Sequence, residues 1–241
     1  MNNVKKRNWK GYFLEFIMLF LAVTLGFMAD NFREKISERT KEKEYIQSMI
    51  EDVEEDQINI KEVINVNSQR IDNLHSFLNK CFNYSGANRE KIELNKYFTH
   101  VLVHPEFIAP TELTMQQLKN AGGMRLIKSK EAINEIIRYD SKLKKIANQQ
   151  IYYENYQNKE IDIGTKVFNL QKLITAIRNP KNNLTSEDFE LITEDKSALK
   201  ELGNSVAMYE GIIEYYVVLL KQLDEQGEVL IQTLESEYKL E

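Results

Sequence analysis

The residues best suited to metal chemistry are two of the three histidines. His100 and His104 stand four residues apart, the spacing that places two ligands on one face of a helix. The HExxH pattern is absent, and the nearest acid, Glu106, follows Pro105, which would end such a helix. Two histidines do not complete a site, so the sequence favours a partly exposed helix end over a metal site.

Catalytic motifs are not found elsewhere in the sequence. There is no GxSxG, no phosphate loop ending in Gly-Lys-Ser/Thr, and no Cys/His pair at a suggestive spacing. Gly122 and Gly123 could cradle a phosphate, but a helix C-cap is the better interpretation, because glycine readily adopts the left-handed conformation found there. We therefore expect a non-enzymatic protein without metal or cofactor.

Glu15 is the only charged residue in the apolar stretch 11–29. An ionisable residue inside a membrane is costly, which makes Glu15 a candidate carrier of a proton or another ion. Its place about one turn inside the stretch also lets its side chain reach the membrane surface, which is the simpler interpretation.

The stretch 11–29 is predicted to be a transmembrane helix. Its nineteen residues reach roughly 28 Å at about 1.5 Å per residue, close to the thickness of a bilayer's hydrocarbon core. A secretory signal peptide is the alternative, but cleavage after Ala29 would put Phe27 where a small residue is needed. An uncleaved anchor is therefore favoured.

The flanks of this helix predict its orientation. Residues 1–10 form a basic tail, and Trp9 lies where an aromatic belt meets the membrane surface. We expect this tail in the cytoplasm and the C-terminal domain outside, although basic residues also follow the transmembrane stretch. Ala22, Gly26 and Asp30 form a stripe that could let two helices approach closely, and Asp30 and Arg33 mark the membrane exit.

Composition predicts an all-α protein. Only nine Gly and three Pro occur in 241 residues, whereas 42% of the residues are hydrophobic, enough for a sizeable core. The net charge of −5 shows no basic excess, so nucleic acid is not an expected partner. The single cysteine, Cys81, excludes an intramolecular disulfide.

Two apolar ladders predict long helices that pack side by side, after a charged helical stalk at 30–45. Both alternate by four and three residues. The first contains Ile46, Ile50, Val53, Gln57, Ile60, Ile64, Asn67, Ile71, Leu74 and Leu78, and the second contains Leu202, Val206, Tyr209, Ile213, Tyr216, Leu220, Leu223, Gly227, Leu230 and Leu234. Antiparallel pairing within an elongated bundle, residues 46–241, is expected, and a homo-oligomeric coiled coil through 46–78 is the competitor.

Shorter helices are expected between the ladders. Residues 91–104 should form one that ends before Pro105, and a second should begin with Thr111 as its cap. A long helical pattern runs from Ser129, also a candidate cap, to residue 179, with a kink expected at Gly164. A short capped helix is expected within 181–193.

Two segments resemble an uncharacterised family of bacterial single-span membrane proteins. They are LEFIMLFLAVTLGFMADNFRE at 14–34 and TMQQLKNAGGMRLIKSKE at 114–131. The resemblance implies a membrane anchor followed by a helical domain of unknown function. With the orientation predicted from the flanks, we expect the protein in a bacterial inner membrane with this domain in the periplasm. The resemblance implies no catalytic residue, cofactor or substrate.

These features predict a membrane-anchored scaffold or accessory subunit that binds a protein partner, a second copy, or both. Two alternatives remain open. One is a periplasmic ligand-sensing or signal-transducing bundle, in which a small ligand would bind between helices. The other is an ion-coupled single-span assembly that uses Glu15.

Overall fold

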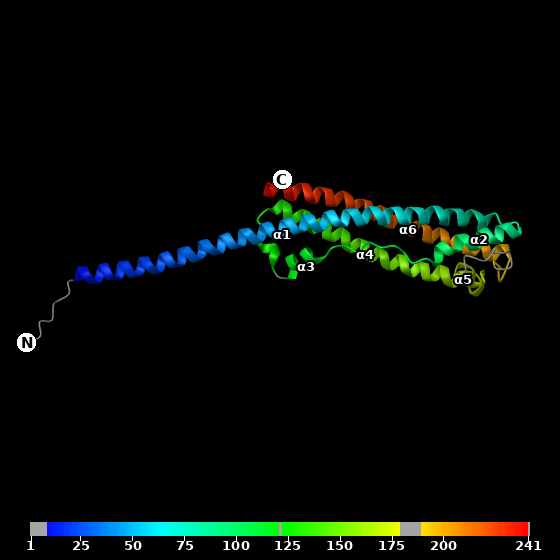
Figure 1. Ribbon diagram of the computed structural model, residues 1–241, viewed down its shortest axis with the longest axis horizontal. Helices are drawn as coiled ribbons and strands as arrows, with labels where there is room; N and C mark the ends of the chain where they lie inside the picture. Colours follow the sequence, from blue (N-terminus) through cyan, green and yellow to red (C-terminus); the bar gives the residue numbers. More distant parts are fainter. Residues whose placement is uncertain (1–8, 121, 179–188, 241) are drawn as a thin grey trace, which may run out of the picture.

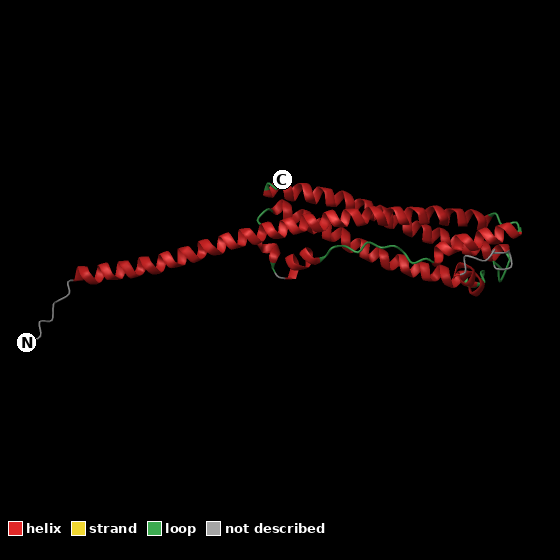
Figure 2. Ribbon diagram, in the orientation of Figure 1, coloured by secondary structure: helices red, strands yellow, loops and turns green. Residues whose placement is uncertain are grey.

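The computed structural model describes residues 9–120, 122–178 and 189–240. These residues form six α-helices and one 3₁₀-helix without a β-strand, which confirms the predicted all-α architecture (Figure 2). The helices are α1 (Trp9–Phe82), α2 (Asn88–Leu102), α3 (Leu113–Asn120), η1 (Gly123–Leu126), α4 (Lys130–Gly164), α5 (Leu170–Arg178) and α6 (Lys196–Tyr238). Most of the basic tail, and the start of the helix expected within 181–193, lie outside the described residues.

Helix α1 runs without a break through 74 residues, about 110 Å at the usual helical rise. None of its residues from Trp9 to Lys41 is buried, and this part projects from the rest of the molecule (Figure 1). Among the described residues, α1 is the one helix with a segment long and apolar enough to cross a membrane. The first buried side chain is Glu42, so packing begins inside the stretch expected to be a solvated stalk.

The remainder is a bundle in which α1, α4 and α6 are the long members. Helix α6 packs against both α1 and α4. The fourth position is filled by α2, the extended segment 103–112 and α3, which together return along the bundle (Figures 1 and 2). The chain therefore runs up, down, up and down, with the second pass only partly helical.

Helices α1 and α6 are antiparallel, as expected from the ladders. The Tyr238 hydroxyl donates to Glu42 Oε1 at 2.6 Å, and Gln57 Nε2 donates to the Asp224 carbonyl at 3.3 Å. At the far end, a Cβ on Gly203 would lie 3.2 Å from Cys81 Cβ. The first ladder thus faces α6 of its own chain, which leaves it unavailable as a seam between copies.

The ladder residues lie where the two helices meet. All ten of the second ladder are buried, and in the first only Gln57, Ile64 and Ile71 are partly exposed. Gly227 belongs to this packing, because a Cβ there would lie 3.1 Å from Val53 Cγ1. The small residue lets the two helices approach closely at this height.

The long helix expected after Ser129 ends earlier than predicted. Ser129 does cap α4, its side chain accepting from the Ala132 amide at 3.1 Å, but α4 stops at Gly164. A Cβ on Gly164 would lie 2.0 Å from Phe98 Cζ, and the chain then turns to stack Phe168 on Phe98 with ring centroids 4.2 Å apart. Aromatic packing at the distal end therefore sets this boundary.

The expected cap at Thr111 is wrong. Helix α3 begins at Leu113, and the Thr111 amide instead donates to Asp56 Oδ1 at 2.7 Å. This contact ties the extended segment to α1.

Candidate functional site

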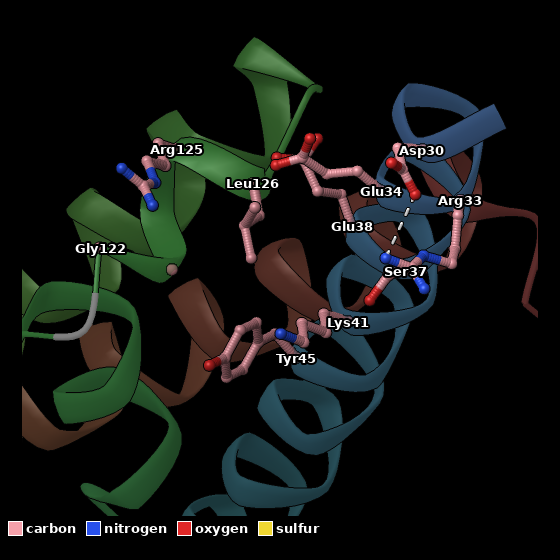
Figure 3. Close-up of a pocket in the computed structure, with 11 residues that line it drawn as sticks. Asp30, Arg33, Glu34, Ser37, Glu38, Lys41, Tyr45, Gly122, Arg125 and Leu126 are labelled. Carbon is pink, nitrogen blue, oxygen red and sulfur yellow. Dashed lines mark ion pairs between the residues drawn. The ribbon is translucent and has the colours of Figure 1, made fainter. Parts of the chain in front are cut away.

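A groove of about 750 Å³ opens where α1 leaves the bundle, and we call it the stalk groove (Figure 3). It lies between α1 and the turn that contains η1. The α1 side is lined by Asp30, Arg33, Glu34, Ser37, Glu38, Lys41 and Tyr45, and the other side by Gly122, Gly123, Arg125 and Leu126. The α1 residues recur every three or four positions, so one face of the helix forms the wall.

The two glycines bring η1 against α1. Gly122 has φ 69°, a left-handed conformation that glycine adopts at little cost. A Cβ on Gly123 would lie 3.1 Å from Leu118 Cα and 3.3 Å from the Tyr45 ring. The glycine pair is therefore a turn and a close-packing site, in agreement with the C-cap interpretation.

Charged side chains of both signs line the stalk groove. Arg33 Nη2 lies 3.5 Å from Asp30 Oδ1, and both side chains are largely exposed. Within the described part of the chain, Glu34, Glu38, Lys41 and Arg125 form no ion pair. Figure 3 shows Glu34 and Glu38 projecting from α1 towards the η1 side. The groove therefore offers charge pairing to a polar partner of complementary pattern.

Residues from two distant segments meet in this groove. Asp30, Arg33 and Glu34 come from 14–34, while Gly122, Gly123 and Arg125 come from 114–131. These are the two segments whose resemblance to single-span membrane proteins was noted above. Sequence reasoning selected Asp30 and Arg33 but did not place them beside the glycine pair, because their proximity depends on the path of α3.

The other predicted membrane residues meet no second helix within the described chain. Trp9 is 85% exposed, and no atom lies within 4 Å of a Cβ built on Gly26. Glu15 and Ala22 are exposed on the same projecting part of α1. Their roles in interface anchoring, ion transfer and helix association stay predictions.

The histidine pair does not share a helix face. Helix α2 ends at Leu102, which leaves His104 in the extended segment, where its carbonyl accepts from Arg70 Nη2 at 2.6 Å. Burial, and then the positive charge of Arg70, lower the pKa of His100. Among the described residues, no group of three His, Cys, Asp or Glu side chains is placed to hold a metal ion.

A buried polar cluster that sequence reasoning missed holds the extended segment in the bundle. Arg70 also donates to the Val103 carbonyl at 3.1 Å and to the Tyr153 hydroxyl at 3.1 Å. Asn67 donates to the Glu106 carbonyl at 2.9 Å, and Gln157 to the Val103 carbonyl at 2.6 Å. Asn67 is one of two polar residues in the first ladder. Its oxygen accepts from the Tyr153 hydroxyl at 2.8 Å, so both ends of its amide bind partners within the same chain.

The same segment is held further along by tyrosines and an acid. The Ile108 amide donates to the Tyr216 hydroxyl at 3.0 Å. Asp56, which binds the Thr111 amide, also accepts from the Tyr139 hydroxyl at 2.7 Å. Burial raises the pKa of Asp56 and outweighs these hydrogen bonds. Side chains from α1, α4 and α6 thus replace the backbone bonds that a helix would have made.

Glu160 is a buried acid with incomplete hydrogen bonding. Its side chain is fully buried on α4, and Ser205 Oγ donates to its Oε1 at 2.6 Å. Its other oxygen, Oε2, has no hydrogen-bond partner among the described residues. Burial raises the pKa of Glu160. The carboxyl group is therefore a point at which ionisation opposes the packing of α4 on α6.

No family model matches this chain, and no curated protein or solved structure is significantly similar to it. The likeness of 14–34 and 114–131 to single-span membrane proteins therefore stays a prediction.

Proposed function

We propose that this protein is a non-enzymatic, membrane-anchored helical module that acts as a scaffold or accessory subunit of a membrane protein complex. The observation that carries the proposal is the continuity of α1 from the apolar segment to the distal end of the bundle. A helix without a break links the orientation of the bundle to that of its anchor. Such a link suits a rigid extension.

The stalk groove is the surface proposed to receive the partner. Twelve residues, 30–41, separate the apolar segment from the first buried side chain, Glu42. They correspond to about 18 Å of helix. In the proposed arrangement the groove begins at the bilayer surface and rises beneath the bundle. Its partner is then a protein segment that itself lies at the membrane surface, with charges complementary to Glu34, Glu38 and Arg125.

The proposed setting is a bacterial inner membrane, with the N-terminus in the cytoplasm and the bundle in the periplasm. The partner is another membrane protein, a second copy, or both, and neither nucleic acid nor a cofactor takes part. The basic tail supports this orientation, and the absence of a global basic excess supports the choice of partner.

Site-specific photocrosslinking in native membranes tests the proposal. A photoreactive residue replaces Ser37 in the groove or, as the control, the exposed Gln232 on α6. We expect a discrete adduct from position 37 only, and Glu34→Lys with Glu38→Lys should abolish it. Mass spectrometry of the adduct identifies the partner, and light scattering of the purified complex gives its mass. Equal labelling from both positions, or an adduct that survives charge reversal, would contradict the docking role.

A ligand-sensing bundle is the second candidate. The observation that favours it is the extended segment 103–112, whose backbone is hydrogen-bonded by side chains from α1, α4 and α6. A ligand that bound beside this segment would act on all three helices. The ion-coupled alternative predicts that Glu15→Gln abolishes function, whereas the scaffold predicts that the position-37 adduct persists.

A further inference from the structure

A second groove lies between the chain around α3 and the middle of α4, and we call it the α3–α4 groove. It has a volume of about 270 Å³ and shares no residue with the stalk groove. Its apolar lining is formed by Ile108, Pro110 and Met115 on one side and Leu143, Ile146 and Ala147 on the other. Gln150 lies at the end near the extended segment, where its Nε2 donates to the Ile108 carbonyl at 3.4 Å.

The charges on its rim are unevenly distributed. At one end, Lys119 and Lys144 both bind the Asp140 carboxylate, Lys144 at 2.9 Å. Burial acts to raise the pKa of Asp140, but the two ammonium groups outweigh it and lower that pKa. Two lysines sharing one ionised carboxylate leave one positive charge in excess.

The remaining rim acid is Glu112, which directly precedes α3, whereas Lys119 is near the end of that helix. Glu112 is seven residues before Lys119, about 10 Å along a helical path, and accepts from Gln116 Nε2 at 2.8 Å. The groove therefore has an apolar floor, a cationic end and an end that disfavours anions. This uneven charge favours an occupant with an apolar part and an anionic group, bound with the anionic group at the lysine end.

The size of the groove selects a small molecule. Ligand pockets usually measure about 300–1,000 Å³, so this groove is near the lower limit, and an α-helix about 10 Å across would not fit it. We propose that the α3–α4 groove binds a small anionic amphiphile, such as a medium-chain carboxylate. Its head group accepts hydrogen bonds from Lys119 and Lys144, which have three N–H donors each and share the single Asp140 carboxylate. Its apolar chain lies on Met115, Leu143 and Ala147.

This site is independent of the scaffold role, because its lining shares no residue with the stalk groove and includes no residue of α1. Its occupant contacts both α4 and the chain leading into α3. Binding therefore stabilises the contact between α4 and the extended segment 103–112, to which Ile108 and Pro110 belong.

Methionine methyl NMR on the full chain in phosphatidylcholine nanodiscs tests the proposal. The chain has seven methionines, and Met115→Leu assigns the signal from the groove. Sodium octanoate is the probe, and 1-octanol is its uncharged counterpart. We expect a saturable shift of the Met115 signal with octanoate. Met18 and Met28 lie in the apolar part of α1, so their signals report partitioning of octanoate into the bilayer. These signals should shift without saturating.

Two sets of variants separate the head-group and chain contacts. Lys119→Gln with Lys144→Gln should weaken octanoate binding by about tenfold or more, because the charge-assisted bonds are lost. Ala147→Phe fills the floor and should abolish the Met115 shift, whereas Ala207→Phe, an exposed alanine on α6, should leave it unchanged. Absence of a saturable shift, its persistence in Ala147→Phe, or equal affinity in the lysine variant would overturn the proposal. Equal affinity for 1-octanol would overturn the requirement for an anion.

Discussion

At the residue scale, the buried acid Glu160 gives the bundle a specific pH dependence. The pKa of Glu160 is raised in the folded protein, so its favourable contribution is complete below its unfolded pKa and is lost as pH rises through the folded pKa. Glu160→Gln keeps an acceptor for Ser205 without the charge. We expect this variant to be more stable than wild type by about 1 kcal/mol at pH 8, with little difference at pH 4.

Thermal unfolding followed by circular dichroism at both pH values checks this prediction. Glu154→Gln, an exposed change on the same helix, is the matched control and should shift neither melting temperature appreciably. A variant that is less stable than wild type at pH 8 but not at pH 4 would show that the ionised carboxylate makes a favourable contact, which would contradict this prediction.

Replacing two helical glycines by alanine should have opposite effects on the stability of the bundle. A Cβ on Gly164 would lie 2.0 Å from Phe98 Cζ, so Gly164→Ala should cost about 1–3 kcal/mol through overpacking. Apart from the chain neighbours and the backbone of its own helix, no atom of the described residues lies within 4 Å of a Cβ on Gly211, so Gly211→Ala should gain up to about 1 kcal/mol from helix propensity. Melting temperatures should move in opposite directions. A stabilised Gly164→Ala variant would contradict the packing described for the distal end.

At the element scale, the position of the extended segment 103–112 depends on hydrogen bonds from Arg70, which lies on α1. Replacing Arg70 by Met leaves the His104 carbonyl without its side-chain donor and the Val103 carbonyl with Gln157 alone, which should cost about 2–4 kcal/mol. Hydrogen–deuterium exchange should accelerate most in 103–112 and α2. The control Arg138→Met removes an exposed arginine paired with Glu135 on the same helix and should leave exchange in this segment unchanged. Uniform acceleration across the bundle would show that Arg70 has no local role.

The long helices could be predicted from the sequence, whereas the segments that connect them could not. Apolar residues spaced alternately by four and three identified both ladders, because a helix that is buried on one face carries apolar residues at this period. The sequence of segment 103–112 has no such periodic pattern. Its backbone is satisfied by side chains such as Arg70 and Gln157, more than thirty and fifty residues away. The stalk groove was equally inaccessible, because it requires Gly123 to reach Tyr45 across the fold.

At the scale of the whole molecule, the central property is the continuity of α1 between the apolar segment and the bundle. Residues 30–41 include no buried side chain, so a change there should alter orientation without altering the stability of the bundle. Ser37→Pro removes one helical hydrogen bond and introduces a steric clash that kinks the helix. We expect the melting temperature of the bundle to stay the same while the angle between span and bundle becomes variable.

Spin-label distance measurements in nanodiscs separate these two effects. Labels on cysteines at positions 19 and 232, in a background where Cys81→Ala removes the native thiol, should give a narrow distance distribution with wild-type Ser37. Ser37→Pro should broaden that distribution, and Ser37→Ala should leave it narrow. A broad distribution before any change at position 37 would mean that α1 bends freely, and the stalk groove would then lack a fixed height and direction from which to present Glu34 and Glu38 to a partner.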